Sequence, residues 1–297
     1  MTPDEYDEFL KKAFEAYLRV RAQEACQPSR AYLPYNVVDL SAPRWSAMGD
    51  MLIKDELREL TNILNAWLGT LRHWHAWLTV SQGYSDEDTW QLEYEFIAPL
   101  ATYCLFQPSA IRDTFTFVVT NGMHQVLLAT DSSYKDRLIL DQAPWEERKY
   151  PTRRKKEEQL ASVINRWPKG RSLLDNLRRL DDGTTRDATS DFRNRSSHSI
   201  APRFSRGTTR MVTRTIEQAT RMERRADGGC EWVPVSGKTA VCYGFGGTEP
   251  LDLDQVRQVN LAQFDIAVAC FDLYLALLTK TTAARSSARA RLLESVR

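Results

Sequence analysis

The sequence predicts a mainly α protein, a bundle of long helices with a small β-hairpin inserted before the last long helix. Apolar residues recur at helical spacing over several long segments, and capping residues, glycines and prolines mark the ends of those segments. A Gly-rich stretch with β-forming residues interrupts the pattern near residue 240. Of the 297 residues, 42% are hydrophobic and 27% are charged, which is enough apolar content for an ordinary core.

The first half of the chain is predicted to form four helices. A Thr-Pro-Asp-Glu sequence at the start is typical of a capping box with Pro at the first helical position. The third helix is expected to bend at Pro99, and the β-branched residues of the fourth leave a strand open as an alternative. The four segments run from Thr2 to about Ala25, from Asp50 to Gly83, from Ser85 through Ile97, and from Ser109 to about Leu128.

The second half is predicted to hold shorter helices, the hairpin and the last long helix. We expect a charged linker first, then a helix broken by a Pro-Lys-Gly sequence and stopped by Asp-Asp-Gly. A Thr- and Arg-rich segment follows, and its sequence is compatible with either a helix or a strand. The expected segments are the linker Trp145 to Lys156, the helix breaks at Pro168 and Asp181, the ambiguous segment Thr208 to Thr220, hairpin strands at Val233 to Val235 and Thr239 to Phe245 joined at Ser236-Gly237, and a helix from about Asp252 to Lys280.

Two regions are predicted, an N-terminal helical region (1–145) and a second region (146–297), with one continuous domain as the alternative. The apolar run from Leu261 to Leu278 is interrupted by polar residues, which favours a buried helix over a membrane span. Five widely spaced cysteines favour reduced thiols in the cytoplasm over a disulfide framework or a zinc site. We expect no metal and no other cofactor.

The net charge of +1 hides an uneven distribution. Residues 148–225 hold 21 Lys and Arg against 9 Asp and Glu, which leaves 19 of the 40 basic and 30 of the 39 acidic residues for the rest of the chain. A basic block within an otherwise acidic chain indicates a polyanionic partner such as RNA, and a solvated arm is the alternative interpretation.

Within this block lies the sequence Arg193-Asn194-Arg195-Ser196-Ser197-His198. An Arg followed directly by Asn, and by His five positions later, resembles the signature of the HEPN superfamily. That family consists of small helical bundles in which the Arg and His often cleave RNA without a metal. The resemblance covers this one motif and its helical setting.

The resemblance implies a role for each motif residue. His198 would transfer the proton, because an imidazole titrates near working pH, and Arg193 would hold the scissile phosphate. Asn194 would orient one of them or bind the backbone phosphate. Since the Arg and the His are five positions apart, they lie about 1.4 helical turns apart. A complete site therefore needs either a distorted helix or two copies of the chain. The resemblance implies the second, a homodimer in which two copies face each other across a cleft.

The leading interpretation is a metal-independent endoribonuclease, and the resemblance implies a setting in toxin–antitoxin pairs or antiphage defence, with a neutralising antitoxin or sensor as a further partner. The first alternative is a HEPN-like bundle that binds RNA, a nucleotide or a protein without cleavage. The second is a helical interaction protein with an accidental Arg/His match. The arginines expected to bind the RNA backbone are Arg195, Arg203, Arg206, Arg210 and Arg214.

The other candidate functional residues have weaker support from the sequence. His73 and His75 are two positions apart on a predicted helix, so they point to different faces and do not share a metal. His124 is expected to be a core residue with its hydrogen bonds satisfied. The glycines from Gly244 to Gly247 lack phosphate-loop spacing and are interpreted as a turn between strand and helix.

Overall fold

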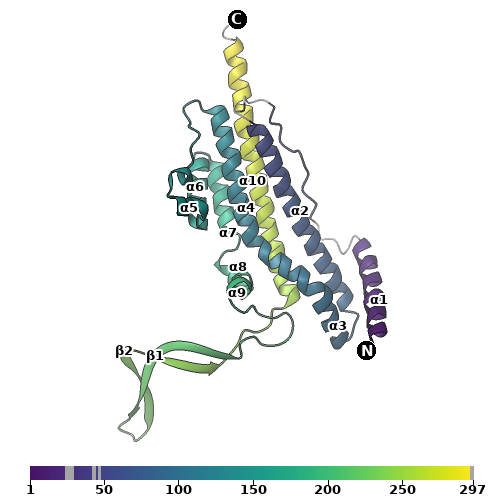
Figure 1. The fold of residues 1–297 in the computed structure, drawn as a ribbon, viewed down its shortest axis with the longest axis vertical. Helices are drawn as coiled ribbons and strands as arrows, with labels where there is room; N and C mark the ends of the chain where they lie inside the picture. The colour runs from purple at the N-terminus through teal and green to yellow at the C-terminus, as the bar shows by residue number, and fades with distance from the viewer. Residues whose placement is uncertain (24–29, 42–44, 46–47, 295–297) are drawn as a thin grey trace. The chain divides into compact units, whose positions relative to one another are not determined.

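The structure, a computed structural model, describes residues 1–23, 30–41, 45 and 48–294, with side chains up to residue 282. It is mainly helical, with a two-stranded antiparallel hairpin just before the last long helix, so the predicted fold class is confirmed (Figure 1). The chain divides into two compact units, Met1–Ala188 with Asp254–Arg297, and Thr189–Leu253. Both sides of the boundary predicted near residue 145 lie in the first unit.

The helices of the first unit are α1 (Pro3–Ala22), α2 (Gly49–Ser81), α3 (Asp86–Leu92), α4 (Ala98–Thr130), α5 (Trp145–Lys149), α6 (Arg153–Ile164), α7 (Pro168–Arg179), α8 (Gly183–Ala188) and α10 (Leu253–Glu294, from its second residue on). A π-helical turn, Glu93–Ile97, joins α3 to α4, and a 3₁₀ turn covers Ile139–Gln142. The second unit holds α9 (Phe192–His198), β1 (Val212–Arg224) and β2 (Cys230–Phe245).

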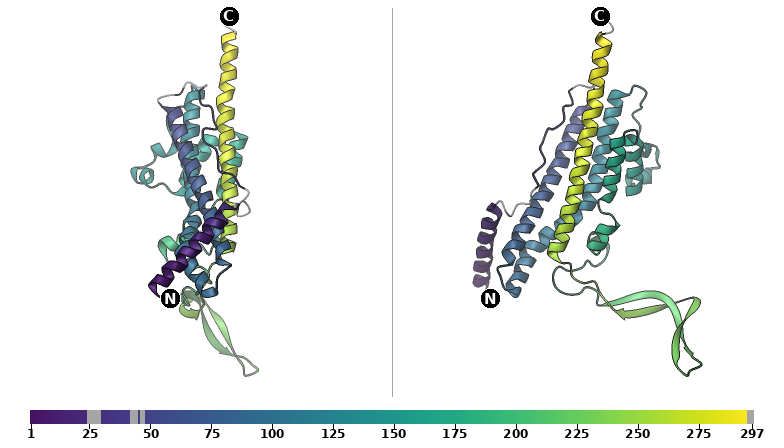
Figure 2. Two further views of the ribbon diagram at one scale, coloured as in Figure 1. Left: turned by 90° about the vertical axis from the view of Figure 1, so that its right-hand side faces the viewer. Right: turned by 180° about the vertical axis from the view of Figure 1, so that it is seen from behind.

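The core of the first unit lies among the long helices α2, α4 and α10, which run side by side in both figures of the fold (Figures 1 and 2). Trp67 of α2 packs edge-on against Phe264 of α10, with ring centroids 5.4 Å apart. Gly122 of α4 lies directly under Tyr274 of α10, where an added Cβ would come within 2.0 Å of the phenol oxygen. The close approach of α4 and α10 therefore depends on a residue without a side chain.

The predicted capping box of α1 is confirmed. The Thr2 N–H donates to Glu5 Oε2 at 2.7 Å, and the Glu5 N–H donates back to Thr2 Oγ1 at 3.3 Å. The helix is described to Ala22, and Ala25, its predicted end, lies outside the described residues. Tyr17 stacks on Trp77 of α2 at 4.6 Å, which fixes α1 to the bundle.

The fourth helix was predicted to begin at Ser109, and this start is wrong. Helix α4 begins at Ala98 and passes through Ser109 without a break. Pro108 lies inside this helix and is buried. The strand alternative is wrong, since Val118 and Val119 are helical. Packing of the buried side chains on either side of Pro108 outweighs both the local proline penalty and the β propensity.

The segment predicted as a charged linker is also partly helical, because it contains α5 and the start of α6. Thr152 caps α6 by accepting from the Lys155 N–H at 3.4 Å. The predicted break at Pro168 is confirmed as a boundary, but Pro168 begins α7, at a position where the missing N–H is not needed.

The hairpin differs from its predicted pairing. Strand β1 pairs with β2 in antiparallel register, and the turn is formed by the Asp-Gly-Gly sequence at 227–229. Gly228 has a φ of +84°, and Asp227 Oδ1 accepts from the Gly229 N–H at 2.9 Å, which suits a tight turn. Both strands predicted on either side of Ser236-Gly237 belong to β2, where that dipeptide falls at a register shift.

The segment Leu253–Thr282 of α10 is long and apolar enough to cross a membrane, and half of its most apolar window is buried inside the structure. Gln263 on this helix accepts from the Asp181 N–H at 2.8 Å and donates to the Arg179 carbonyl at 3.2 Å. Polar contacts thus join α10 to the segment that follows α7.

Candidate functional site

The Arg-Asn-x₃-His motif forms the short helix α9 of the second unit. Ser190 and Asp191, directly before it, both have left-handed backbone conformations, with φ of 48° and 51°. Such conformations cost roughly 1–3 kcal/mol each in non-glycine residues and concentrate at functional sites. Phe192 is buried and its ring lies 5.2 Å from that of Phe204, which anchors the helix within its unit. The motif is therefore held on a defined helix.

Arg193 and His198 do not share a face of α9. Five positions along an α-helix correspond to a rotation of about 140°, so the two side chains leave the helix axis in different directions. Within the part of the chain that the structure describes, neither side chain makes a hydrogen bond or an ion pair, and His198 is exposed. Both groups are therefore free to bind a ligand. In a single copy of the chain, however, the two side chains point in different directions and do not contact the same phosphate.

The other two polar groups of the motif are engaged within the chain. Asn194 donates from Nδ2 to Asp191 Oδ2 at 3.0 Å, on the residue that precedes the helix. Arg195 donates to the Ile200 carbonyl at 3.0 Å and to Thr248 Oγ1 at 2.8 Å. Arg195 thereby joins α9 to the segment that follows β2.

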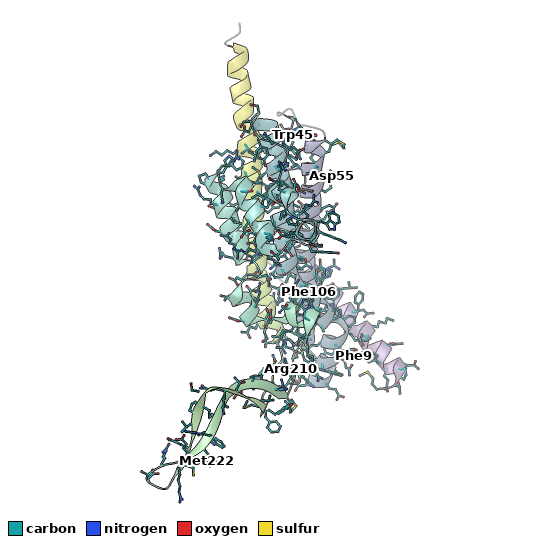
Figure 3. All side chains as sticks on the ribbon, turned by 60° about the vertical axis from the view of Figure 1, so that its left-hand side comes forward. Phe9, Trp45, Asp55, Phe106, Arg210 and Met222 are labelled. Atoms are coloured by element: carbon teal, nitrogen blue, oxygen red, sulfur yellow. The ribbon has the colours of Figure 1, made fainter. Side chains whose placement is uncertain are left out.

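The remaining predicted RNA-binding arginines lie on exposed loops and on β1. Arg203 is exposed and rests against Gly207, where an added Cβ would be 3.1 Å from its Nη1. Arg206 is exposed and has an interaction within the chain. Arg210 is exposed at a left-handed backbone position with φ of 59°, where the hairpin begins (Figure 3), and Arg214 is exposed on β1.

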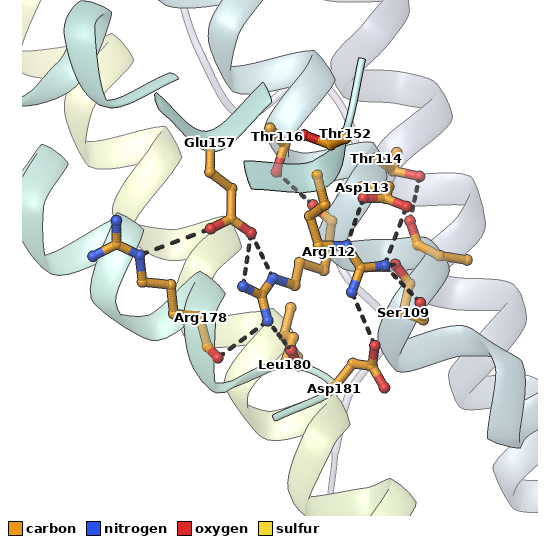
Figure 4. A network of polar contacts seen from close by, with 12 residues as sticks. Ser109, Arg112, Asp113, Thr114, Thr116, Thr152, Glu157, Arg178, Leu180 and Asp181 are labelled. Atoms are coloured by element: carbon orange, nitrogen blue, oxygen red, sulfur yellow. Dashed lines mark hydrogen bonds and ion pairs between the residues drawn. The ribbon is translucent and has the colours of Figure 1, made fainter. Parts of the chain in front are cut away.

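The basic block seen in the sequence is divided between two roles. In the first unit, Arg153 bonds Asp113 at 3.0 Å and Asp181 at 2.9 Å. Arg178 lies 3.8 Å from Glu157, which also bonds Arg112 at 2.7 Å (Figure 4). In the second unit, residues 193–214 contain six Arg and no acidic residue. Arg206 has an interaction within the chain, and the other five arginines form no ion pair in the described part of the chain. This shorter segment therefore carries positive charge that no acidic residue within it offsets.

His124 is buried, as predicted, and both ring nitrogens are hydrogen-bonded, to the Tyr134 hydroxyl and to Asp136 Oδ1, each at 2.8 Å. These partners come from the loop after α4. The sequence indicated a satisfied histidine but not these two partners, because their pairing depends on how that loop folds back.

The sequence-based reasoning missed the hairpin surface, where Tyr243 is 71% and Phe245 is 95% exposed. The signal was present as apolar and aromatic residues at alternating positions of the second strand, at 241, 243 and 245, and at 212 and 216 of the first strand. It was overlooked because the two strands were not paired with each other.

Comparison with models of protein families, with curated proteins and with solved structures finds no match for this chain. Among the described residues, no group of three or more His, Cys, Asp and Glu side chains is arranged to hold a metal ion.

Proposed function

We propose that this protein is a cytoplasmic, metal-independent endoribonuclease that acts as a homodimer. The observation that carries the proposal is a histidine and an arginine, both free of intrachain bonds in the described structure, on one anchored helix within a segment of six Arg and no acidic residue. Such a segment attracts the phosphate backbone largely without regard to base sequence. The resemblance of the motif to the HEPN signature supplies the type of reaction.

In the proposed reaction, the neutral imidazole of His198 removes the proton of a ribose 2′-hydroxyl. The resulting oxygen attacks the adjacent phosphorus and the bond to the 5′-oxygen breaks. The leaving 5′-oxygen takes a proton from the imidazolium of His198, so the products are a 2′,3′-cyclic phosphate and a 5′-hydroxyl. The guanidinium of Arg193 stabilises the additional negative charge on the phosphate oxygens, and such a contact contributes ~3 kcal/mol in oxyanion sites.

The angle of about 140° between the two side chains on α9 is the reason for proposing a dimer. With two copies related by a two-fold axis, His198 of one chain and Arg193 of the other can reach the same phosphodiester. The neutralising antitoxin or sensor partner that the resemblance implies stays a prediction.

The test is incubation of the purified protein with single-stranded RNA in the presence of a chelator. We expect wild-type protein to yield 2′,3′-cyclic phosphate ends, and His198→Ala and Arg193→Ala to lower the rate by about 100-fold or more. Ser196→Ala is the matched control, because Ser196 is exposed on the same helix and lies outside the proposed pair. Cleavage that persists in both motif variants contradicts the proposed site.

RNA binding without cleavage is the second candidate function. It is favoured by the separation of Arg193 and His198 around the helix, and by the hydrogen bond that engages Asn194 with Asp191. RNA that binds the wild-type protein and remains intact in every condition of this assay supports this second function and contradicts the first.

A further inference from the structure

The hairpin of the second unit presents one face that is rich in apolar and aromatic side chains. Directly opposed residues of an antiparallel pair lie on the same face, with Cβ atoms about 4.5–5.5 Å apart. Three successive non-adjacent pairs near the open end of the hairpin share one such face. We call it the aromatic face, and its pairs are Val212 with Phe245, Arg214 with Tyr243, and Ile216 with Val241.

The side chains of this face are unusually exposed for their type. Phe245 is 95%, Tyr243 71% and Ile216 67% exposed. Each strand has the other as its single neighbour, so β1 and β2 form a two-stranded sheet with no third strand among the described residues. A contiguous apolar surface of this kind marks a binding site in a stable protein.

The charge on the two faces of this half of the hairpin differs. The aromatic face carries the guanidinium of Arg214, directly opposite Tyr243, and no acidic residue. The other face carries Glu217, together with small and polar residues such as Thr213 and Thr215. A flat aromatic ring beside a guanidinium suits a ligand that offers a base to one and a phosphate to the other.

The aromatic face is also linked to the motif helix within the second unit. Thr248, three residues after Phe245, accepts from Arg195 of α9 at 2.8 Å and pairs with Thr209 in an isolated bridge. Gly247 permits this junction, because an added Cβ would come within 2.3 Å of Thr208 Cγ2. Three residues of extended chain span at most about 10 Å, so the face begins close to the helix that carries Arg195.

We propose that the aromatic face binds single-stranded RNA, with bases stacked on Phe245 and Tyr243 and a phosphate held by Arg214. The proposal rests on the proposed function for the identity of the ligand and adds its class and its binding surface. Single-stranded RNA is favoured over duplex because the bases of a duplex are already stacked on each other. It is favoured over a protein partner because the adjoining segment 193–214 carries six Arg and no acid.

The test measures binding by fluorescence anisotropy of a labelled 12-nucleotide oligouridylate and of an RNA duplex of equal length. All proteins carry His198→Ala so that cleavage does not interfere. Loss of one stacked base lowers affinity by about 5- to 150-fold. We therefore expect Tyr243→Ala with Phe245→Ala to weaken binding of the single strand by at least about 30-fold. Tyr243→Phe, which keeps the ring, should bind within about 3-fold of the parent.

Two controls separate this surface from general effects. Thr213→Ala lies on the opposite face of the same strand and should leave affinity unchanged, and Tyr150→Ala removes a 75% exposed ring from the first unit and should do the same. Sedimentation of each variant reports the oligomeric state, and circular dichroism reports folding.

Unchanged affinity in the double aromatic variant overturns the proposal, as does equal loss with Thr213→Ala. Conversion of a wild-type dimer to a monomer by the double variant also overturns it, because the face is then a subunit interface. The cleavage assay is independent: RNA bound by this face but never cut contradicts the nuclease alone, whereas cleavage with unaltered binding in the aromatic variant contradicts the RNA surface alone.

Discussion

The ion pair between Arg112 of α4 and Glu157 of α6 is predicted to stabilise the first unit strongly. The guanidinium contacts Glu157 Oε1 through Nε at 2.8 Å and Nη2 at 2.7 Å, and the two side chains are only 12% and 10% exposed (Figure 4). Glu157→Ala would leave the buried guanidinium without its carboxylate. Removing one partner of a buried pair costs about 3–5 kcal/mol.

The lower end of that range applies here, because Arg112 keeps two other acceptors. Its Nη1 also donates to the carbonyls of Leu180 at 2.9 Å and Arg178 at 3.3 Å. We therefore expect Glu157→Ala to lower the free energy of unfolding by about 3 kcal/mol, out of the ~5–15 kcal/mol typical of a folded protein. Urea unfolding followed by circular dichroism measures this change.

A double variant and an exposed pair serve as controls. Arg112→Met with Glu157→Leu removes both charges and should be less destabilised than Glu157→Ala alone, because no buried charge is left unpaired. The Arg154–Glu158 pair is well exposed, at 89% and 56%, so Glu158→Ala should change stability by less than about 1 kcal/mol. Equal effects of Glu157→Ala and Glu158→Ala would refute the reasoning.

Two further predictions concern the bundle. Gly122→Ala should cost about 1–3 kcal/mol, because the new methyl overlaps the Tyr274 hydroxyl, whereas Gly183→Ala has open space around its Cβ and should be nearly neutral; equal melting temperatures for the two would contradict this packing. Partial burial lowers the pKa of both His73 and His75 below the ordinary value of about 6.5. Below that pH the unfolded chain binds protons that the folded chain does not, so the free energy of unfolding should fall as the pH drops from 6.5. A variant with both histidines changed to Gln should show a flatter pH profile, and an unaltered slope between pH 7 and 5 would exclude these histidines as its cause.

The elements of the bundle could largely be predicted because their signals are local. The capping box at Thr2, the helix boundary at Pro168 and the apolar stripe of α2 each depend on residues within a few turns of one another. The continuous course of α4 through Pro108 could not be predicted this way. There, burial against other helices decides the conformation, and this burial is not visible in a short window of sequence.

The candidate site could likewise be predicted only where its signals are local. The resemblance of the motif to the HEPN signature identified Arg193 and His198 as candidates, and the structure places them on a short helix. Sequence did not reveal that Arg195 bonds Thr248, 53 positions away, or that Arg153 belongs to an ion-pair network. An arginine in a basic stretch looks the same whether or not a distant carboxylate faces it.

The sequence by itself determined a mainly helical chain, a hairpin before the last helix and a local excess of arginine, because periodicity, capping and composition act over short distances. Only the tertiary structure decided which strand pairs with β1, which arginines are neutralised, and that Tyr243 and Phe245 share an exposed face with Arg214. These features depend on contacts between residues far apart in the chain, and such contacts arise only when the whole chain has found its lowest free energy.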